Sequence, residues 1–163
     1  MDVSADVADL FEALYPRLVV VLYATCGHQG DAEDAVQEAF TKALRNQRKF
    51  VSLDSPEAWL RTVALNHLRN GWRHHAVVRR LRSKVPGLQA SFELGTDHVA
   101  IMAALAELER PQREVVVLHY LVDLSVAEIA TTLGIAQGTV KSRLSRSRDR
   151  LAALLTEEER EDA

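Results

Sequence analysis

The residues best suited to binding a ligand lie close together in the sequence, between positions 124 and 144. Ser125 and Glu128 have the spacing of a capping box, which starts a helix by satisfying its first backbone N–H groups. Gly134 follows where a short helix would end, since glycine readily adopts the left-handed conformation of such an end. A second helix is predicted from residue 137 to about residue 155. Helix, glycine turn and helix in this order are typical of a helix-turn-helix, whose second helix can enter the major groove of DNA.

The second of these helices divides into an apolar stripe and a polar side. At the helical period, the stripe predicted to be buried comprises Val140, Leu144, Leu151 and Leu155. The side chains that point away from it are Lys141, Ser142, Ser145 and Arg146. Such polar and basic groups can bind phosphates and base edges. The alternative is an ordinary amphipathic hairpin with a solvated basic face, which the agreement of cap, turn and spacing disfavours.

The composition is that of a soluble globular protein. With 163 residues, of which 47% are hydrophobic and 26% charged, the chain can form one ordinary domain or two small ones. The single cysteine, Cys26, cannot form an internal disulfide, which fits a reducing compartment. We therefore predict a cytoplasmic protein, because no signal peptide is indicated and the apolar run 18–24 is too short to span a bilayer.

The sequence offers no set of residues for a metal site or an enzyme active site. Cys26 and His28 lack a second pair at ligand spacing, and the adjacent His74 and His75 cannot face one ion from a helix. No paired carboxylates, Ser/His/Asp set or glycine-rich phosphate loop can be placed in a cleft. We expect no catalytic residue, no cofactor and no metal, and hence a protein that is not an enzyme.

The formal net charge of -3 is unfavourable for binding DNA, but the charges are unevenly distributed. Between Glu57 and Glu93 the chain has no acidic residue. The cations of that segment are Arg61, Arg69, Arg73, Arg79, Arg80, Arg82 and Lys84. A second cluster in the last predicted helix comprises Lys141, Arg143, Arg146, Arg148 and Arg150. Since local potential rather than total charge attracts a polyanion, two separate contacts with nucleic acid are predicted.

The periodicity of the first half predicts helices. A first helix is expected after Ser4 with a bend at Pro16, a second helix is expected to be capped by Asp31, and a third to start at Pro56. The third is expected to continue towards Arg73. Residues 46–55 are expected to form a polar, basic loop between the second and third helices.

The periodicity weakens over residues 76–97, which are expected to be a flexible linker. Beyond it, helices are predicted over residues 99–108 and 111–122, followed by the helix-turn-helix. No strand alternation occurs. The predicted fold class is therefore all-α, with two small helical domains joined by a linker.

Three motifs in this order resemble the extracytoplasmic-function sigma factors, the small promoter-recognition subunits of bacterial RNA polymerase. The motifs are residues 31–40 (DAEDAVQEAF), Trp59-Leu60-Arg61 with Asn66 seven residues after the tryptophan, and residues 124–130 (LSVAEIA) with 138–144 (GTVKSRL). The residues around Asn66 are most similar to the actinobacterial branch often called the SigE family. The resemblance implies sigma region two over residues 1–75, the linker over 76–97, sigma region four over 98–155 and an acidic tail over 156–163.

The resemblance implies that the second helix docks on the clamp helices of the polymerase β′ subunit. The residues that share its predicted exposed side are Asp34, Gln37, Glu38 and Thr41. The opposite side, with Val36, Phe40 and Leu44, is predicted to face inward. A polar, acidic docking face is therefore available, and a merely solvated helix face is the alternative.

The family also melts the minus-ten promoter element and holds a non-template base in a pocket before the third helix. Residues of that segment here are Arg48, Lys49, Phe50 and Asp54. Phe50 could cover an unstacked base or fill the core, and both interpretations stay open. Asn66 is the position where the family reads minus-ten bases, and an amide can pair with a base edge. The arginines expected to hold phosphates are Arg61, Arg69 and Arg73.

In region four, the family reads the minus-thirty-five element with the second helix of the helix-turn-helix. The matching residues are Thr139, Lys141, Ser142, Arg143 and Arg146. The implied partners are core RNA polymerase, through the β′ clamp helices and the β flap, and promoter DNA. A further partner class in this family is an anti-sigma factor, which holds many members inactive.

Two residues depart from the family's pattern. Ala136 stands where a serine often caps the recognition helix, which weakens that cap by about 1 kcal/mol. Glu109 follows Leu108 where a proline is usual, and Pro111 comes two residues later. Two other classes of protein remain as alternatives: a dimeric helix-turn-helix regulator that does not touch polymerase, and a helical adapter that binds another protein through its first bundle.

Overall fold

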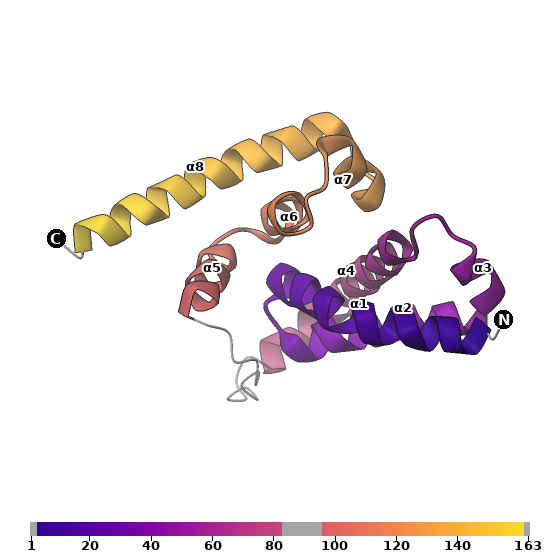
Figure 1. The fold of residues 1–163 in the computed structure, drawn as a ribbon. Helices are drawn as coiled ribbons and strands as arrows, with labels where there is room; N and C mark the ends of the chain where they lie inside the picture. The colour runs from indigo at the N-terminus through magenta and orange to yellow at the C-terminus, as the bar shows by residue number, and fades with distance from the viewer. Residues whose placement is uncertain (1–2, 83–95, 162–163) are drawn as a thin grey trace. The chain divides into compact units, whose positions relative to one another are not determined.

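The computed structural model describes residues 3–82 and 96–161 (Figure 1). Helices account for nearly all of these residues, and the described ranges contain no strand. The chain divides into two compact units, Met1–Phe92 and Glu93–Ala163, each with its own packed interior. The prediction of an all-α protein with two small helical domains is confirmed.

The first unit consists of helices α1 (Val3–Cys26), α2 (Gln29–Arg45), α3 (Gln47–Val51) and α4 (Pro56–Arg82). Helix α2 lies against both α1 and α4, so it occupies the middle of the bundle. Its inward side carries small residues that let the neighbouring helices approach closely, and Val36 is fully buried among them. Leu22 of α1 and Leu60 of α4 are equally buried. Burial of these side chains stabilises the unit because it removes apolar surface from water.

Helix α2 begins three residues earlier than predicted, with its cap at position 28 and not at position 31. Its N-terminal cap is His28, whose Nδ1 accepts a hydrogen bond of 3.2 Å from the backbone N–H of Asp31. The prediction that Asp31 is the cap is therefore wrong. An imidazole nitrogen can do the same work as a carboxylate oxygen at this position, and Asp31 remains in the first turn, where a negative charge favours the helix.

The segment 46–55 is not a plain loop, because it contains α3. Phe50 anchors this helix by its burial, and α3 packs against α1. Helix α4 then begins at Pro56 as predicted, and the Ser55 hydroxyl accepts a hydrogen bond of 3.3 Å from the Ala58 N–H. The segment was predicted to be a loop because its composition is polar, but it contains a short helix that one large apolar side chain holds in place.

The boundaries of the predicted linker and tail also differ from the structure. Helix α4 continues through residues 76–82, and α8 continues to Glu161, so neither the predicted linker nor the acidic tail is free of helix. The reason for the first difference lies in the sequence, because no glycine or proline occurs between Gly71 and Pro86. The remaining linker positions, 83–95, lie outside the described residues.

The second unit consists of α5 (Thr96–Ala106), α6 (Arg110–Val116), the π-helical turn η1 (Val117–Leu121), α7 (Val126–Leu133) and α8 (Gln137–Glu161). Helices α6 and α7 both pack on α8. The interior is formed by apolar side chains from each of these elements, and its fully buried members include Val115, Leu118, Ile129 and Val140.

Arg113 holds the corner between α5 and α6 together. Its Nε donates a hydrogen bond of 2.8 Å to the carbonyl oxygen of Leu105, and its guanidinium also donates to the carbonyl oxygens of Ala106 (3.2 Å) and Leu108 (3.0 Å). The last carbonyls of a helix lack intrahelical partners, so this side chain satisfies groups that would otherwise need water. The entry into α6 is thus fixed although Glu109 makes no side-chain cap and stands where the family usually has a proline.

Candidate nucleic-acid interface

Helices α7 and α8 form the helix-turn-helix. The Ser125 hydroxyl accepts a hydrogen bond of 3.2 Å from the Glu128 N–H, and the Glu128 carboxylate accepts one of 2.7 Å from the Ser125 N–H. Both halves of the predicted capping box are therefore present. Gly134 ends α7 with a φ of 65°, a left-handed conformation that favours glycine. The turn places α8 against α7 through the buried side chain of Ile129.

The inner side of α8 holds the recognition helix in place. Val140 and Leu144 are buried, as the apolar stripe predicted. The stripe continues through Ser147, which is fully buried and whose hydroxyl donates a hydrogen bond of 2.6 Å to the Arg143 carbonyl oxygen. This bond back to the preceding turn explains how a hydroxyl is tolerated among apolar neighbours. Leu151 is half-buried, and the side chain of Leu155 lies outside the described ones.

The outer side of α8 presents the residues predicted to read the minus-thirty-five element. Lys141, Ser142 and Arg146 are exposed, while Thr139 and Arg143 are half-buried at the edge of this side. The Ser142 hydroxyl donates to the Thr139 carbonyl oxygen at 3.0 Å, so it retains accepting capacity for another donor. The arrangement presents two exposed cations on one helix, which suits contacts to a phosphate backbone.

Helix α4 presents a second polar side in the first unit. Asn66 is exposed, as are His67 and Asn70, and Arg69 is half-buried. The sequence analysis missed Asn70, although it lies one helical turn after Asn66 and so shares its side of the helix. The side chain of Arg73 lies outside the described ones. An exposed amide on a rigid helix has the donor and acceptor that base recognition requires.

Arg61 does not lie on this polar side. Only 7% of its surface is exposed, and its guanidinium lies 3.9 Å from the Glu57 carboxylate. The Glu57 carboxylate is also 3.7 Å from Arg17 of α1. The prediction that Arg61 holds a phosphate is therefore wrong for this structure, because the side chain is turned into the bundle beside its partner. Its arginine-rich surroundings in the sequence gave no sign of this inward orientation.

The segment before α4 divides into exposed and buried members. Arg48, Lys49 and Asp54 are exposed, as contact with a single strand would require. Phe50 is 2% exposed, and its ring centroid lies 5.4 Å from that of Trp59. Of the two interpretations of Phe50, the structure supports the core one and contradicts a base cover, because a buried ring has no free face for a base.

Helix α2 presents the predicted docking face. Asp34, Gln37 and Thr41 are exposed, and Glu38 is half-buried and forms an ion pair of 3.7 Å with Lys42. The Gln37 amide donates a hydrogen bond of 3.4 Å to the Tyr15 hydroxyl of α1. A surface ion pair of this kind contributes little to stability, so Glu38 can exchange its partner at low cost.

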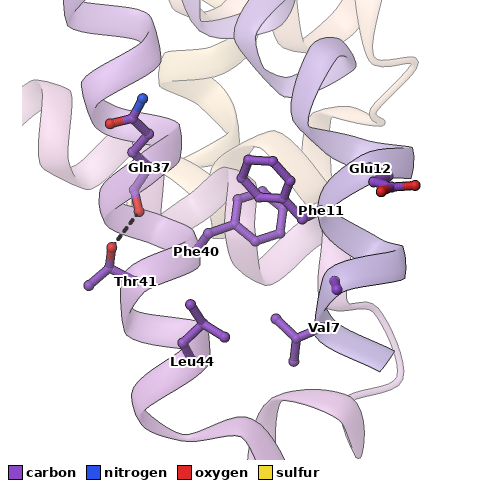
Figure 2. A pocket seen from close by; sticks show the side chains of 8 residues that line it. Val7, Phe11, Glu12, Gln37, Phe40, Thr41 and Leu44 are labelled. Carbon is purple, nitrogen blue, oxygen red and sulfur yellow. Dashed lines mark hydrogen bonds between the residues drawn. The ribbon is translucent and has the colours of Figure 1, made fainter. Parts of the chain in front are cut away.

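An apolar groove between α1 and α2 adjoins this face (Figure 2). Gln37 and Thr41 line its polar side, while Phe11, Phe40 and Leu44 line its apolar side. Phe11 is 40% exposed and Leu44 is 48% exposed, and the rings of Phe11 and Phe40 meet edge to face at 4.9 Å. The prediction that Leu44 faces inward is therefore wrong. Leu44 lies two turns after Gln37 on the same side of α2, a relation that could have revealed the exposure.

Within 3–82 and 96–161, no group of three or more His, Cys, Asp or Glu is arranged to hold a metal ion. Cys26 donates a hydrogen bond of 3.2 Å from its thiol to the His28 carbonyl oxygen. Over the same described ranges, no helix combines the length and the apolar character that a membrane span needs.

Comparison with known proteins relates each unit to a described family. The Sigma-70 region 2 family matches residues 10–78, and the Sigma-70 region 4 family matches residues 98–151. The chain is 37% identical over 152 residues to the ECF RNA polymerase sigma factor SigL of Mycobacterium tuberculosis, with 86% of each chain covered. It is 31% identical over 171 residues to the ECF RNA polymerase sigma factor EcfG of Rhodopseudomonas palustris, with 99% of this chain and 92% of the relative covered.

A solved structure is similar over nearly the same extent. It is that of the sigma factor RpoE of Bartonella quintana in complex with the anti-sigma factor NepR. The similarity covers 93% of this chain and 97% of that chain at a TM-score of 0.74 and 28% sequence identity. Both the order of the two units and the helices within them are therefore shared with a protein of known structure.

Proposed function

Because this chain belongs to the extracytoplasmic-function sigma factors of RNA polymerase, we propose that it directs initiation by reading the minus-thirty-five element as duplex and the minus-ten element as a melted strand. The observation that carries the proposal is that two separately packed units each present polar, DNA-compatible side chains on a rigid helix, α8 in one and α4 in the other. The partners are core polymerase and promoter DNA. The chemistry of RNA synthesis belongs to the polymerase.

In the second unit, α8 enters the major groove of the upstream element. Lys141 and Arg146 bind phosphates or guanine edges, and Ser142 contributes a hydroxyl at the same surface. The capping box and Gly134 support this role indirectly, because they fix the angle at which α8 leaves α7. Thr139 and Arg143 are half-buried and act at the margin of the contact.

In the first unit, α4 reads the melted element through Asn66, while Arg48 and Lys49 of α3 hold the backbone of the displaced strand. All three side chains are exposed, and α3 immediately precedes the turn into α4. The half-buried Arg69 adds a cation next to Asn66. Phe50 supports the site from within the core and does not touch a base.

The replacement Asn66→Ala tests the minus-ten assignment. We expect discrimination at one minus-ten position to fall about tenfold or more, because a lost amide–base pair is worth about 1–3 kcal/mol. The measurement is run-off transcription with core polymerase on a promoter library randomised over the minus-ten element. The fold is expected to be unchanged, since Asn66 is exposed.

The other positions of the minus-ten element serve as the control for Asn66→Ala, because substituting their bases should affect the variant and the wild-type protein equally. The variant should lose preference at that position and keep the wild-type ranking of bases at the others. A variant with the wild-type preference at every position would show that Asn66 does not read the element. A wild-type protein that initiates at no specific promoter would overturn the proposed function itself.

The docking surface on polymerase combines the polar face of α2 with the adjoining groove. Gln37 and Thr41 belong to both, so one partner helix can contact the polar residues and place an apolar side chain beside Phe11 and Leu44. This combination of an apolar centre and a polar rim is typical of specific interfaces. The half-exposed Phe11 and Leu44 would be covered in such a complex.

The charge reversal Asp34→Lys tests this docking surface. We expect binding to core polymerase to weaken about tenfold, because a misplaced charge at a complementary interface costs free energy. Asp9→Lys is the matched control, since Asp9 is an exposed acid of the same unit that does not line the groove. Affinity for fluorescently labelled core polymerase measures both variants. Equal affinities for the two variants would contradict the assignment of this face.

We also propose an anti-sigma factor as a partner class that competes for these surfaces. The support is the similarity to RpoE of Bartonella quintana, which was solved in complex with an anti-sigma factor. Co-purification of the chain with core polymerase, and its loss when such an inhibitor is added, tests the competition. Joint binding of both proteins to the chain would contradict it.

A further inference from the structure

Gly138 occupies a position where nothing among the described residues requires a glycine. It lies in the first turn of α8 with helical backbone geometry. Apart from its chain neighbours and the adjacent backbone of α8, a Cβ built on Gly138 meets no atom of the described residues within 4 Å, so these residues leave space for a side chain there. Glycine is a poor helix former compared with alanine, and here no positive φ offsets that cost.

Two other glycines of the chain have internal reasons for their identity. Gly134 has a φ of 65°, which strains any residue with a Cβ. Gly30 occupies the second position of α2, as Gly138 does in α8, and a Cβ there would lie 3.2 Å from the Cε1 of the capping His28. Gly138 differs from both glycines, because its backbone is not strained and its surroundings are not crowded.

The side of α8 on which Gly138 lies indicates that the reason for a glycine here is a molecule outside the protein. Positions three and four residues apart share one side of a helix, so Gly138 begins the same exposed side as Lys141 and Ser142. That side is the one proposed to face DNA. Because glycine has no side chain, the backbone at the N-terminal end of this side can approach a surface more closely than it could with any other residue at position 138.

We propose that Gly138 is a positioning residue for promoter recognition: it lets the first turn of α8 approach the wall of the major groove at contact distance. The inference rests on the proposed function of the second unit. With a methyl group at position 138, α8 is held away from the groove. Lys141 and Ser142 then lose the DNA contacts that require α8 to lie deep in the major groove.

The test is the replacement Gly138→Ala, with Gly138→Ser as a second variant. We expect the affinity for a duplex carrying the minus-thirty-five element to fall about tenfold, which corresponds to the loss of one good base or phosphate contact. The melting temperature of the free protein should stay equal or rise by a few degrees, because alanine favours the helix. The two measurements are thus predicted to move in opposite directions.

The duplex is the one that wild-type protein and core polymerase select from a randomised promoter library. Ala152→Ser serves as the matched control, because Ala152 is an exposed residue of the same helix far along from Lys141. Wild-type affinity in Gly138→Ala would overturn the inference, and so would a lower melting temperature that explains the lost binding. If the wild-type protein selects no duplex at all, the proposed function has failed and not the role of Gly138.

Discussion

Replacing Lys141 and Arg146 together by alanine is expected to lower promoter-directed initiation about a hundredfold. Both side chains are exposed on the outer side of α8, and neither takes part in the packing that holds this helix against α7. Each lost contact to a phosphate or base should cost about 1–2 kcal/mol, and the two costs add if the contacts are independent. Run-off transcription with core polymerase on the selected promoter measures the effect.

The dependence of binding on salt adds a second readout to this experiment. Removal of each phosphate contact reduces the slope of log affinity against log salt by about one. Arg160→Ala removes a cation from the exposed far end of α8 and should leave transcription unchanged. Wild-type transcription by the double variant would show that α8 is not the element that reads the promoter, and the adapter alternative would then gain support.

The second large effect is expected from Phe50→Ala, which should lower the free energy of unfolding of the first unit by about 3–5 kcal/mol. The ring is buried, packs against Trp59 and anchors α3 to the bundle. Alanine leaves a cavity that the surrounding helices can fill only in part. Thermal and denaturant unfolding of the full chain, followed by circular dichroism, measure the loss.

Phe50→Leu distinguishes the core role from a base contact. Leucine retains most of the apolar volume, so this variant should be destabilised far less than the alanine variant and should still open promoters. Permanganate reactivity of thymines in the melted element reports the opening. A leucine variant that folds stably but fails to open DNA would restore the base-cover interpretation of Phe50.

Features set by short-range chemistry were predictable from the sequence. The capping box of Ser125 and Glu128, the left-handed Gly134 and the start of α4 at Pro56 each depend on residues within one turn of chain. The exposed side of α8 was predictable for the same reason, because periodicity alone defines it once the helix is known. These local signals were sufficient to suggest a helix-turn-helix.

Features set by contacts between distant residues were not predictable. Helix α3 exists because Phe50 finds a site in the bundle, and Arg61 turns inward beside Glu57, which also lies near Arg17 of α1. Leu44 is exposed because α1 leaves a groove beside it. Composition cannot distinguish these cases, since a basic or apolar residue can face either way until the neighbouring helix is placed.

The corner held by Arg113 has a mechanical consequence. Because one guanidinium binds three carbonyl oxygens around this corner, α5 and α6 cannot swing independently without breaking charge-assisted hydrogen bonds. Glu107, the residue directly after α5, also forms an exposed ion pair of 3.8 Å with Arg150 of α8. The angle between α5 and α6 is therefore set by the side chain of Arg113, and a variant without this guanidinium would leave the two helices free to pivot about the corner.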